Sequence, residues 1–241
     1  MIQLKIRRLP ETDLARIAPL DRDGKWRALQ RQNTGFSPIT YDPVRGQTLD
    51  IYNATSPLVP DSADTDWSTI ERLIRRAARN KDERESNVTV GSLLYKFIRE
   101  RRITAVHRDH GRFATRIGDA VRYWDSAVLV DGDDLLIPFP DYRRTFTLGT
   151  EGRRFAASVM HHGIRAQNPA ELGQSKLAVF TFPQVANSDE RLVRMIVVPD
   201  GELYAADELA AMIAETYDLW AEILAQRAQE AQRSGTIGGL L

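Results

Sequence analysis

Four histidines in two closely spaced pairs are the residues whose chemistry is easiest to read from the sequence. His107 and His110 form the first pair, and His161 and His162 form the second. Imidazole and carboxylate groups together suit several divalent ions. Three carboxylates are candidates to complete such a site: Asp109, Asp125 and Asp141. Adjacent histidines on a helix cannot easily both turn toward one ion, and the arginine-rich surroundings repel cations. We therefore expect no bound metal and no cofactor.

A second pattern joins carboxylates to one of these pairs. Asp141 follows a proline, and Glu151-Gly152-Arg153 comes further along the chain. This order resembles that of restriction-endonuclease-type nucleases, in which an Asp precedes a Glu-x-Lys pair that binds a divalent metal. The chain departs from that pattern because Arg replaces Lys and because Glu151 falls at an expected helix start. The resemblance implies an alternative function: a metal-dependent hydrolase in which Asp141 and Glu151 hold the metal and His161 or His162 transfers a proton.

Other catalytic patterns are missing. The sequence contains no G-x-x-x-x-G-K-[ST] loop, no G-x-G-x-x-G after a strand and no G-x-S-x-G elbow. His107-Arg108-Asp109 lacks the Asn that a kinase catalytic loop needs five residues later, since position 114 is Ala. Without a cysteine there is no disulfide and no thiolate nucleophile. These absences favour a protein that is not an enzyme.

The distribution of charge points instead to binding. The 33 basic and 33 acidic residues cancel overall, but residues 71–116 hold 13 basic and 6 acidic groups. Residues 199–241 hold 2 basic and 8 acidic groups. Arginine outnumbers lysine 28 to 5, and its guanidinium fork binds phosphates and carboxylates with two hydrogen bonds. A GC-rich genome would also raise the arginine content, without any function.

From this asymmetry we expect a non-enzymatic binding or assembly subunit, whose basic middle contacts nucleic acid or an acidic protein surface. The expected phosphate or carboxylate ligands are Arg72, Arg76, Arg79, Arg99, Arg102, Arg108, Arg112, Arg143, Arg144, Arg154 and Arg165. A further alternative is a homo-oligomeric structural protein. In that case the acidic C-terminal helix would meet the basic middle, either of its own chain or of a second copy.

The sequence also carries signals about its compartment. No window holds 18 consecutive apolar residues, so we expect no membrane contact. Residues 1–7 alternate like a strand and lack the apolar run of a signal peptide. We therefore expect a cytoplasmic protein of a prokaryote.

The pattern of apolar residues predicts an α+β fold, with a mixed or mainly antiparallel sheet packed against three or four amphipathic helices. We expect helices over residues 66–80, 88–102, 151–165 and 207–232. Their expected caps are a Ser68 and Glu71 capping box, Asn87 and Asp207. About eight residues would join the first two helices, which is too long for a helix-turn-helix.

Short alternating or apolar runs predict the strands. They cover residues 1–7, 48–53, 127–130, 135–139, 144–148, 177–182 and 192–198. Asp131-Gly132-Asp133-Asp134 is a good hairpin turn, whereas residues 111–124 are ambiguous between helix and irregular structure. The expected organisation is an irregular N-terminal segment over 1–65, a main domain over 66–232 and a flexible tail over 233–241.

Overall fold

The computed structural model describes residues 8–32, 39–55, 64–114 and 120–233, and it shows one mixed sheet covered by helices. The strand order is β1-β2-β3-β4-β5-β6. Two neighbouring pairs, β1 with β2 and β4 with β5, are parallel, and the other three pairs are antiparallel. The expected α+β class with a mixed sheet is confirmed.

The strands that carry the centre of the sheet are those with the clearest apolar runs. The six strands are β1 Ala54–Thr55, β2 Thr104–His107, β3 Ala127–Asp131, β4 Asp134–Asp141, β5 Lys176–Thr181 and β6 Arg194–Val198. The hairpin of β3 and β4 turns at Gly132, whose φ of 62° suits glycine. The predictions for β3, β4, β5 and β6 are confirmed, because buried runs bounded by turn residues leave little ambiguity.

Side chains alternate between the two faces of the sheet, and each face has its own core. Ala127 and Leu129 of β3 and Leu136 of β4 belong to one cluster of buried residues, whereas Val128 and Ile137 belong to the other. This alternation follows from the two-residue period of a strand. Two helical layers are therefore needed to cover the sheet.

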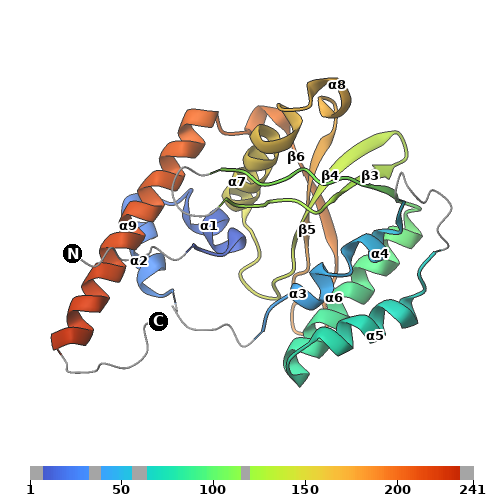
Figure 1. The fold of residues 1–241 in the computed structure, drawn as a ribbon, viewed down its shortest axis with the longest axis horizontal. Coiled ribbons are helices and arrows are strands. Elements are labelled where there is room, and N and C mark those ends of the chain that lie inside the picture. The colour runs from blue at the N-terminus through green and yellow to red at the C-terminus, as the bar shows by residue number, and fades with distance from the viewer. Residues whose placement is uncertain (1–7, 33–38, 56–63, 115–119, 234–241) are drawn as a thin grey trace.

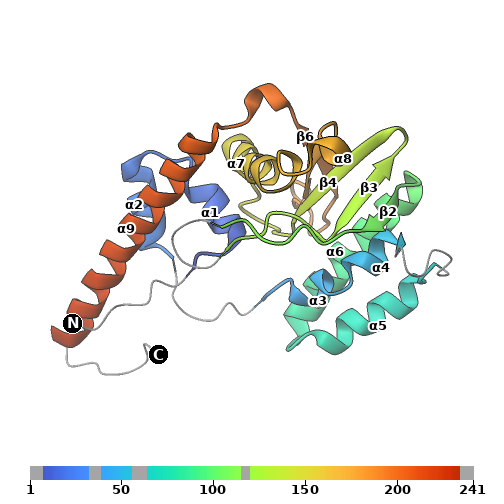
Figure 2. The same cartoon turned by 45° about the horizontal axis from the view of Figure 1, so that its top comes forward.

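The first layer contains α3 Asp42–Arg45, α4 Thr48–Tyr52, α5 Trp67–Ala77 and α6 Lys81–Glu100. The second contains α1 Glu11–Ile17, α2 Arg22–Gln30, α7 Thr150–Met160 and α9 Ala206–Arg233. Figures 1 and 2 show α9 at the left edge beside α1 and α2, and α5 with α6 at the opposite end. The acidic helix α9 therefore does not meet the basic α5–α6 pair within one chain, which corrects the intramolecular version of that expectation.

Shorter elements complete the second layer. The helix α7 continues as a π-helix over His161–Arg165, followed by α8 Pro169–Leu172 and a 3-10 turn over Asp200–Glu202. The expected helix over 151–165 is thereby confirmed. No described helix combines the length and the apolar character that crossing a bilayer requires.

The N-terminal region is more ordered than its sequence indicates. Residues 48–53 were expected to form a strand, but Thr48–Tyr52 is the helix α4. The described part of the segment expected to be irregular contains four helices, and Leu14 and Ile51 are fully buried in the two cores. The strand expected over residues 1–7 and most of the tail over 233–241 lie outside the described residues.

Helix boundaries also differ from the predictions. Asp66 caps α5 by accepting the Thr69 N–H at 2.7 Å, so Ser68 lies inside the helix. The helix α6 begins at Lys81 with Asn80 as its cap, which places Asn87 in the helix interior. Only residues 78–80 therefore separate α5 from α6, rather than about eight residues.

Two further predictions fail in the second half of the chain. Residues 144–146 form a bend and residues 147–148 are irregular, so there is no strand here, and Asp207 lies in the first turn of α9 instead of capping it. Within the described part of 111–124 there is no helix, although Phe113 and Val121 form an isolated antiparallel bridge. Gly111, with a φ of 71°, is the first residue of this segment.

Candidate functional site

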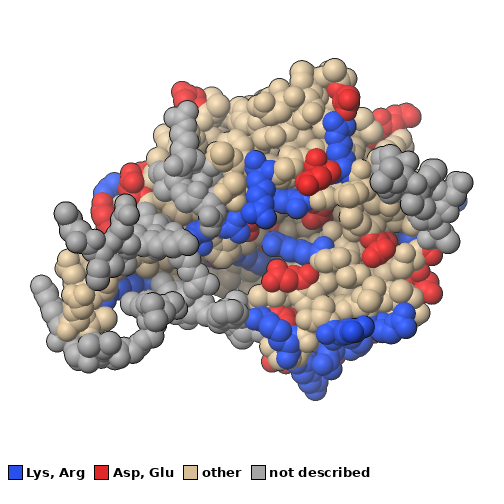
Figure 3. All heavy atoms as spheres, in the orientation of Figure 1, with Lys and Arg blue, Asp and Glu red and all other residues tan. Residues whose placement is uncertain are grey.

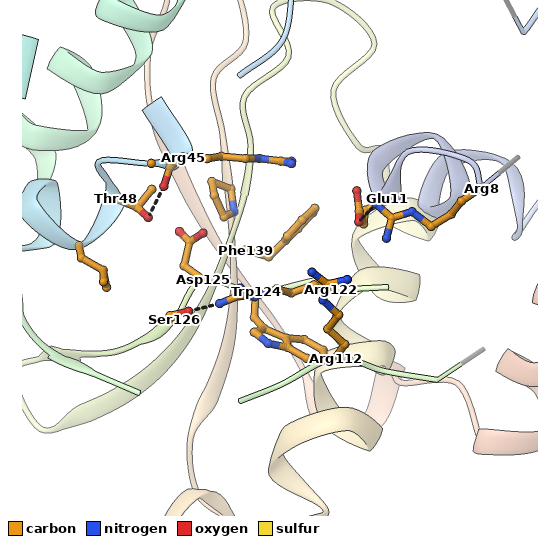
Figure 4. A pocket seen from close by; sticks show the side chains of 13 residues that line it. Arg8, Glu11, Arg45, Thr48, Arg112, Arg122, Trp124, Asp125, Ser126 and Phe139 are labelled. Atoms are coloured by element: carbon orange, nitrogen blue, oxygen red, sulfur yellow. Dashed lines mark hydrogen bonds and ion pairs between the residues drawn. The ribbon is translucent and has the colours of Figure 1, made fainter. Parts of the chain in front are cut away.

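An arginine-lined cavity of about 320 Å³ opens between the two helical layers, next to the C-terminal half of β4 (Figure 4). The N-terminal part of the chain, from Arg8 to α4, contributes Arg8, Glu11, Arg45, Gly46, Thr48 and Leu49 to its walls. The segment before β3 and the strand β4 contribute Arg112, Arg122, Trp124, Asp125, Ser126, Phe139 and Pro140. Figure 3 shows basic side chains around a hollow in the centre of this face, and a second basic band over α5 and α6. We call the first feature the arginine cavity.

The four arginines of the arginine cavity differ in how they are held. Arg8 donates to the Ala120 carbonyl at 2.9 Å and pairs with Glu11 at 2.9 Å. Arg122 donates to the hydroxyl of Ser126. The side chains of Arg45 and Arg112 are exposed, and neither guanidinium group makes a hydrogen bond or an ion pair with any described residue. Two guanidinium groups of the cavity are therefore available to a ligand.

Asp125 is one of two carboxylates in the arginine cavity. Its Oδ2 accepts a hydrogen bond from the Tyr52 hydroxyl at 2.7 Å. Burial raises the pKa of Asp125 to about 6, although the Tyr52 hydrogen bond and the nearby Arg45 and Arg122 act in the opposite direction. The carboxyl group therefore changes its charge close to neutral pH.

A second cavity, of about 440 Å³, is also lined by Arg45, together with Asp141 and Arg143. Asp141 is fully buried, and its carboxylate accepts the Leu148 N–H at 2.8 Å. Burial raises the pKa of Asp141. Arg143 pairs with Asp13 at 3.0 Å. These contacts hold both ends of the loop over residues 142–148.

The tip of that loop exposes an aromatic side chain. Phe146 is 77% exposed and has a φ of 55°, in a region that residues other than glycine rarely adopt. The Arg16 guanidinium lies 5.9 Å from its ring centroid. Such strained conformations concentrate at binding and catalytic sites, because the surrounding structure must hold them in place.

Most of the arginines expected to bind anions are engaged within the chain. Arg165 is 5% exposed and pairs with Asp200 at 2.8 Å, and Arg79 pairs with the buried Glu83 at 2.6 Å. The others with partners are Arg99 with Asp64, Arg108 with Glu171, Arg143 with Asp13, Arg144 with Asp189, and Arg154 with the Glu202 carbonyl. Arg72, Arg76, Arg102 and Arg112 have no such partner among the described residues.

Of the predicted ligands, Arg112 is the one that the structure places in the arginine cavity. Sequence reasoning missed Arg8, Arg45 and Arg122, which lie outside the most basic stretch of the chain. Arg45 ends a four-residue helix that begins with Asp42-Pro43, and this helix start was the only local signal that could have placed it.

The residues of the hydrolase alternative lie in separate environments. Glu151 accepts the Tyr204 hydroxyl at 2.5 Å, while Asp141 holds the loop described above. The rings of His161 and His162 are 4.8 Å apart, and the Nδ1 atom of His161 accepts a hydrogen bond from Arg165 at 3.0 Å. Within the described ranges, no three His, Asp or Glu side chains form a group that could hold a metal ion. The metal-dependent hydrolase stays a prediction.

Basic cavities and an exposed aromatic side chain, on a loop whose two ends are held by hydrogen bonds and ion pairs, are features of a protein that acts by binding. Comparison with known families agrees with this class. The profile of a family described as the sliding clamp-binding bacterial toxin SocB matches residues 12–230. The DNA replication inhibitor toxin SocB of Caulobacter vibrioides (strain NA1000 / CB15N) is 39% identical over 235 residues, which cover 98% of each chain. The chain therefore belongs to the SocB family. No solved structure matches it.

Proposed function

We propose that this chain binds the bacterial sliding clamp and thereby inhibits DNA replication. The observation that carries this proposal is the 39% identity to the DNA replication inhibitor toxin SocB, which extends over 98% of both chains. The family description names the same partner, the sliding clamp. The function is thus a more specific form of the protein-binding role expected from the sequence.

Phe146 is the residue that we assign to the centre of the clamp interface. Aromatic side chains supply much of the binding energy of protein interfaces when a partner buries them. Among the large apolar side chains described, Phe146 is the most exposed, at 77%, and Val106 follows at 44%. A partner that covers this ring would remove a large apolar surface from water.

The loop that carries Phe146 is held in place before any partner arrives. Leu148 donates its N–H to the buried Asp141, and Arg143 pairs with Asp13. A loop fixed at both ends loses little conformational entropy on binding, which favours tight association.

Charge around the Phe146 ring suits an acidic partner surface. Arg16, which also pairs with Asp13 at 2.9 Å, lies beside the ring, and the carboxylate that pairs with Arg144 belongs to Asp189, which is 98% exposed. An exposed ion pair of this kind contributes little stability, so the Arg144 guanidinium can exchange Asp189 for a carboxylate of the partner. The expected acidic protein partner is thereby proposed to be the clamp.

The test is direct binding of the purified chain to the purified sliding clamp of the same bacterium, measured by isothermal titration calorimetry. We expect Phe146→Ala to weaken binding by about tenfold to a hundredfold, in the range of an interface hot spot. Leu135→Ala is the matched control, because Leu135 is also partly exposed, at 37%. Induced expression of each variant, followed by thymidine incorporation, links binding to replication.

Two results separate the levels of the proposal. Absence of clamp binding by the unaltered chain would overturn the function itself. Binding that Phe146→Ala leaves unchanged would overturn only the assignment of the interface. Contact of the basic middle with nucleic acid remains a separate prediction, and charge reversal at Arg72, Arg76 and Arg102 should abolish any such contact without unfolding the protein.

A further inference from the structure

The arginine cavity brings four positive charges together, and nearby carboxylates neutralise them only in part. Arg8, Arg45, Arg112 and Arg122 share its walls with two carboxylates, Glu11 and Asp125. Like charges held close together repel one another, and this repulsion is screened less in a partly enclosed site than in bulk water. The excess of positive charge, together with the unpaired Arg45 and Arg112, makes the cavity complementary to an anion.

We propose that the arginine cavity is a binding site for a small nucleoside phosphate, whose phosphate groups contact Arg45 and Arg112. Guanidinium groups match the geometry of phosphate oxygens and bind them with two parallel hydrogen bonds. Arg45 comes from the α3 end of the cavity and Arg112 from the segment between β2 and β3, so their side chains enter from different parts of the chain (Figure 4).

The carboxylate of Asp125 indicates that the ligand carries a hydrogen-bond donor in addition to its phosphate groups. A carboxylate repels a bare anion, but it accepts hydrogen bonds from the hydroxyl groups of a sugar or the amino group of a base. Among the described residues, the Tyr52 hydroxyl is the side-chain donor to this carboxylate, and it occupies Oδ2. The Oδ1 atom is then available to a donor on the ligand.

The size and the walls of the arginine cavity also fit a nucleoside phosphate. Its volume of about 320 Å³ lies within the range of small-molecule sites and exceeds what inorganic phosphate would fill. Leu49, which is half-buried, adds apolar wall for a base or sugar, while Trp124 and Phe139 also line the cavity but are only 3% and 2% exposed. A strand of nucleic acid spreads over several nucleotides, which calls for a groove larger than this cavity.

The site does not use the residues assigned to the clamp interface. Phe146, Arg16 and Arg144 do not line the arginine cavity. A nucleotide could therefore be bound with or without the clamp, and the two proposals can fail independently.

The experiment is calorimetric titration of the full chain, without the clamp, using AMP, ADP, ATP and dATP. Inorganic phosphate, pyrophosphate and a single-stranded 12-mer of DNA are titrated in parallel. We expect at least one nucleotide to bind at least tenfold more tightly than phosphate, pyrophosphate and the 12-mer. Arg45→Ala and Arg112→Ala should each weaken the binding of that nucleotide about tenfold or more, since each substitution removes hydrogen bonds between charged groups.

A matched control separates this site from general attraction to arginine. Arg76 is exposed on α5 and, like Arg45, has no partner among the residues the structure describes, so Arg76→Ala should leave nucleotide binding unchanged. Asp125→Asn keeps an oxygen that accepts the Tyr52 hydroxyl. This substitution should lower the affinity for the nucleotide relative to the affinity for pyrophosphate. The charged acceptor for the ligand's hydroxyl or amino group is lost, while the repulsion between the carboxylate and the phosphate groups is relieved. Melting temperatures confirm that each variant is folded.

Three outcomes would overturn the proposal. The first is that no nucleotide binds, and the second is that phosphate, pyrophosphate or the 12-mer binds as tightly as every nucleotide tested. The third is that Arg45→Ala and Arg112→Ala, both folded, bind the nucleotide as the unaltered chain does.

Discussion

The Tyr52 hydroxyl donates a hydrogen bond of 2.7 Å to Oδ2 of Asp125, and this contact joins the end of α4 to the segment that leads into β3. Tyr52 is fully buried, and burial together with the Asp125 charge raises its pKa well above the usual value for a tyrosine. The phenol therefore stays protonated and acts as a donor over the physiological range. An ionised Asp125 is held in place, although its charge is poorly solvated.

Asp125→Asn should stabilise the protein at neutral and alkaline pH. The folded-state pKa of Asp125 is about 6, above the value of about 3.9 for an unfolded chain, so ionisation costs stability as the pH rises through this window. The gain from the substitution should approach about 3 kcal/mol above pH 7, at about 1.4 kcal/mol for each pKa unit. It should shrink toward zero at pH 4.

Urea unfolding of both proteins at pH 4, 5, 6 and 8 measures the difference. A difference in the free energy of unfolding that is the same at every pH would show that the folded-state pKa is not raised. Tyr52→Phe is a useful companion variant, because it removes the donor and should raise the Asp125 pKa further.

A buried ammonium group links α2 to α9. Lys25 is 3% exposed and pairs with Glu215, whose carboxylate also lies 3.8 Å from Arg22. Glu215→Gln leaves this ammonium group without a counter-charge and should cost about 3 kcal/mol of folding free energy. The double variant Lys25→Met with Glu215→Leu should restore much of that loss, since no charge is then buried. Guanidinium chloride unfolding of the unaltered chain, the single variant and the double variant measures these differences in folding free energy. Equal destabilisation by the single and double variants would contradict this account.

His110 should make folding sensitive to acid. Burial, followed by the nearby Arg108 and Arg122, lowers its pKa from 6.5 to about 4. The unfolded chain takes up a proton at this residue below about pH 6.5, whereas the folded chain does so only near pH 4, so stability falls between these values. His110→Gln should reduce this acid-induced loss of folding free energy by about 2 kcal/mol. Melting temperatures at pH 4.5 and pH 7.5 test this prediction. The difference between the two melting temperatures should be smaller for the variant than for the unaltered protein, and an equal difference would refute the assignment.

The sequence indicated the central strands well and the N-terminal helices poorly. The hairpin of β3 and β4 has strong apolar runs around a turn, and neither feature depends on distant contacts. In α4 the residues at 49 and 51 suggested the alternation of a strand. The buried positions are Thr48, Ile51 and Tyr52, whose spacing is helical and is set by packing against α5 and α6.

The arginine cavity could not be predicted because its residues meet only in the folded chain. Arg8, Arg45 and Arg122 come from distant segments outside the most basic stretch of the chain, and Arg112 alone of the four cavity arginines was among the expected ligands. Charge density along the sequence pointed instead to residues 71–116, where arginines such as Arg79 and Arg99 are paired with carboxylates. A linear count of charge does not distinguish a paired guanidinium from an unpaired one.

Glu83 gives a prediction opposite in sign to that for Asp125. Its side chain is fully buried and accepts hydrogen bonds from the Arg79 guanidinium at 2.6 Å and from the Thr40 N–H at 2.8 Å. The Arg79 hydrogen bonds hold the pKa of Glu83 well below its usual range. The ionised group therefore contributes stability above the unfolded pKa of about 4.3, and this contribution is lost as the pH falls toward the folded value.

Glu83→Gln should accordingly cost about 2 to 3 kcal/mol of unfolding free energy at pH 7, because it removes the charge from a hydrogen-bonded network that fastens residue 40 to α6. The cost should decrease steadily below about pH 4. Glu85→Gln is the matched control: Glu85 lies on the same helix but is exposed, and its ion pair with Arg75 at 3.1 Å should contribute less than about 1 kcal/mol. Urea unfolding at pH 7 and pH 3 compares the two variants, and an equal loss from both at pH 7 would mean that the Glu83 network contributes no more than a surface ion pair.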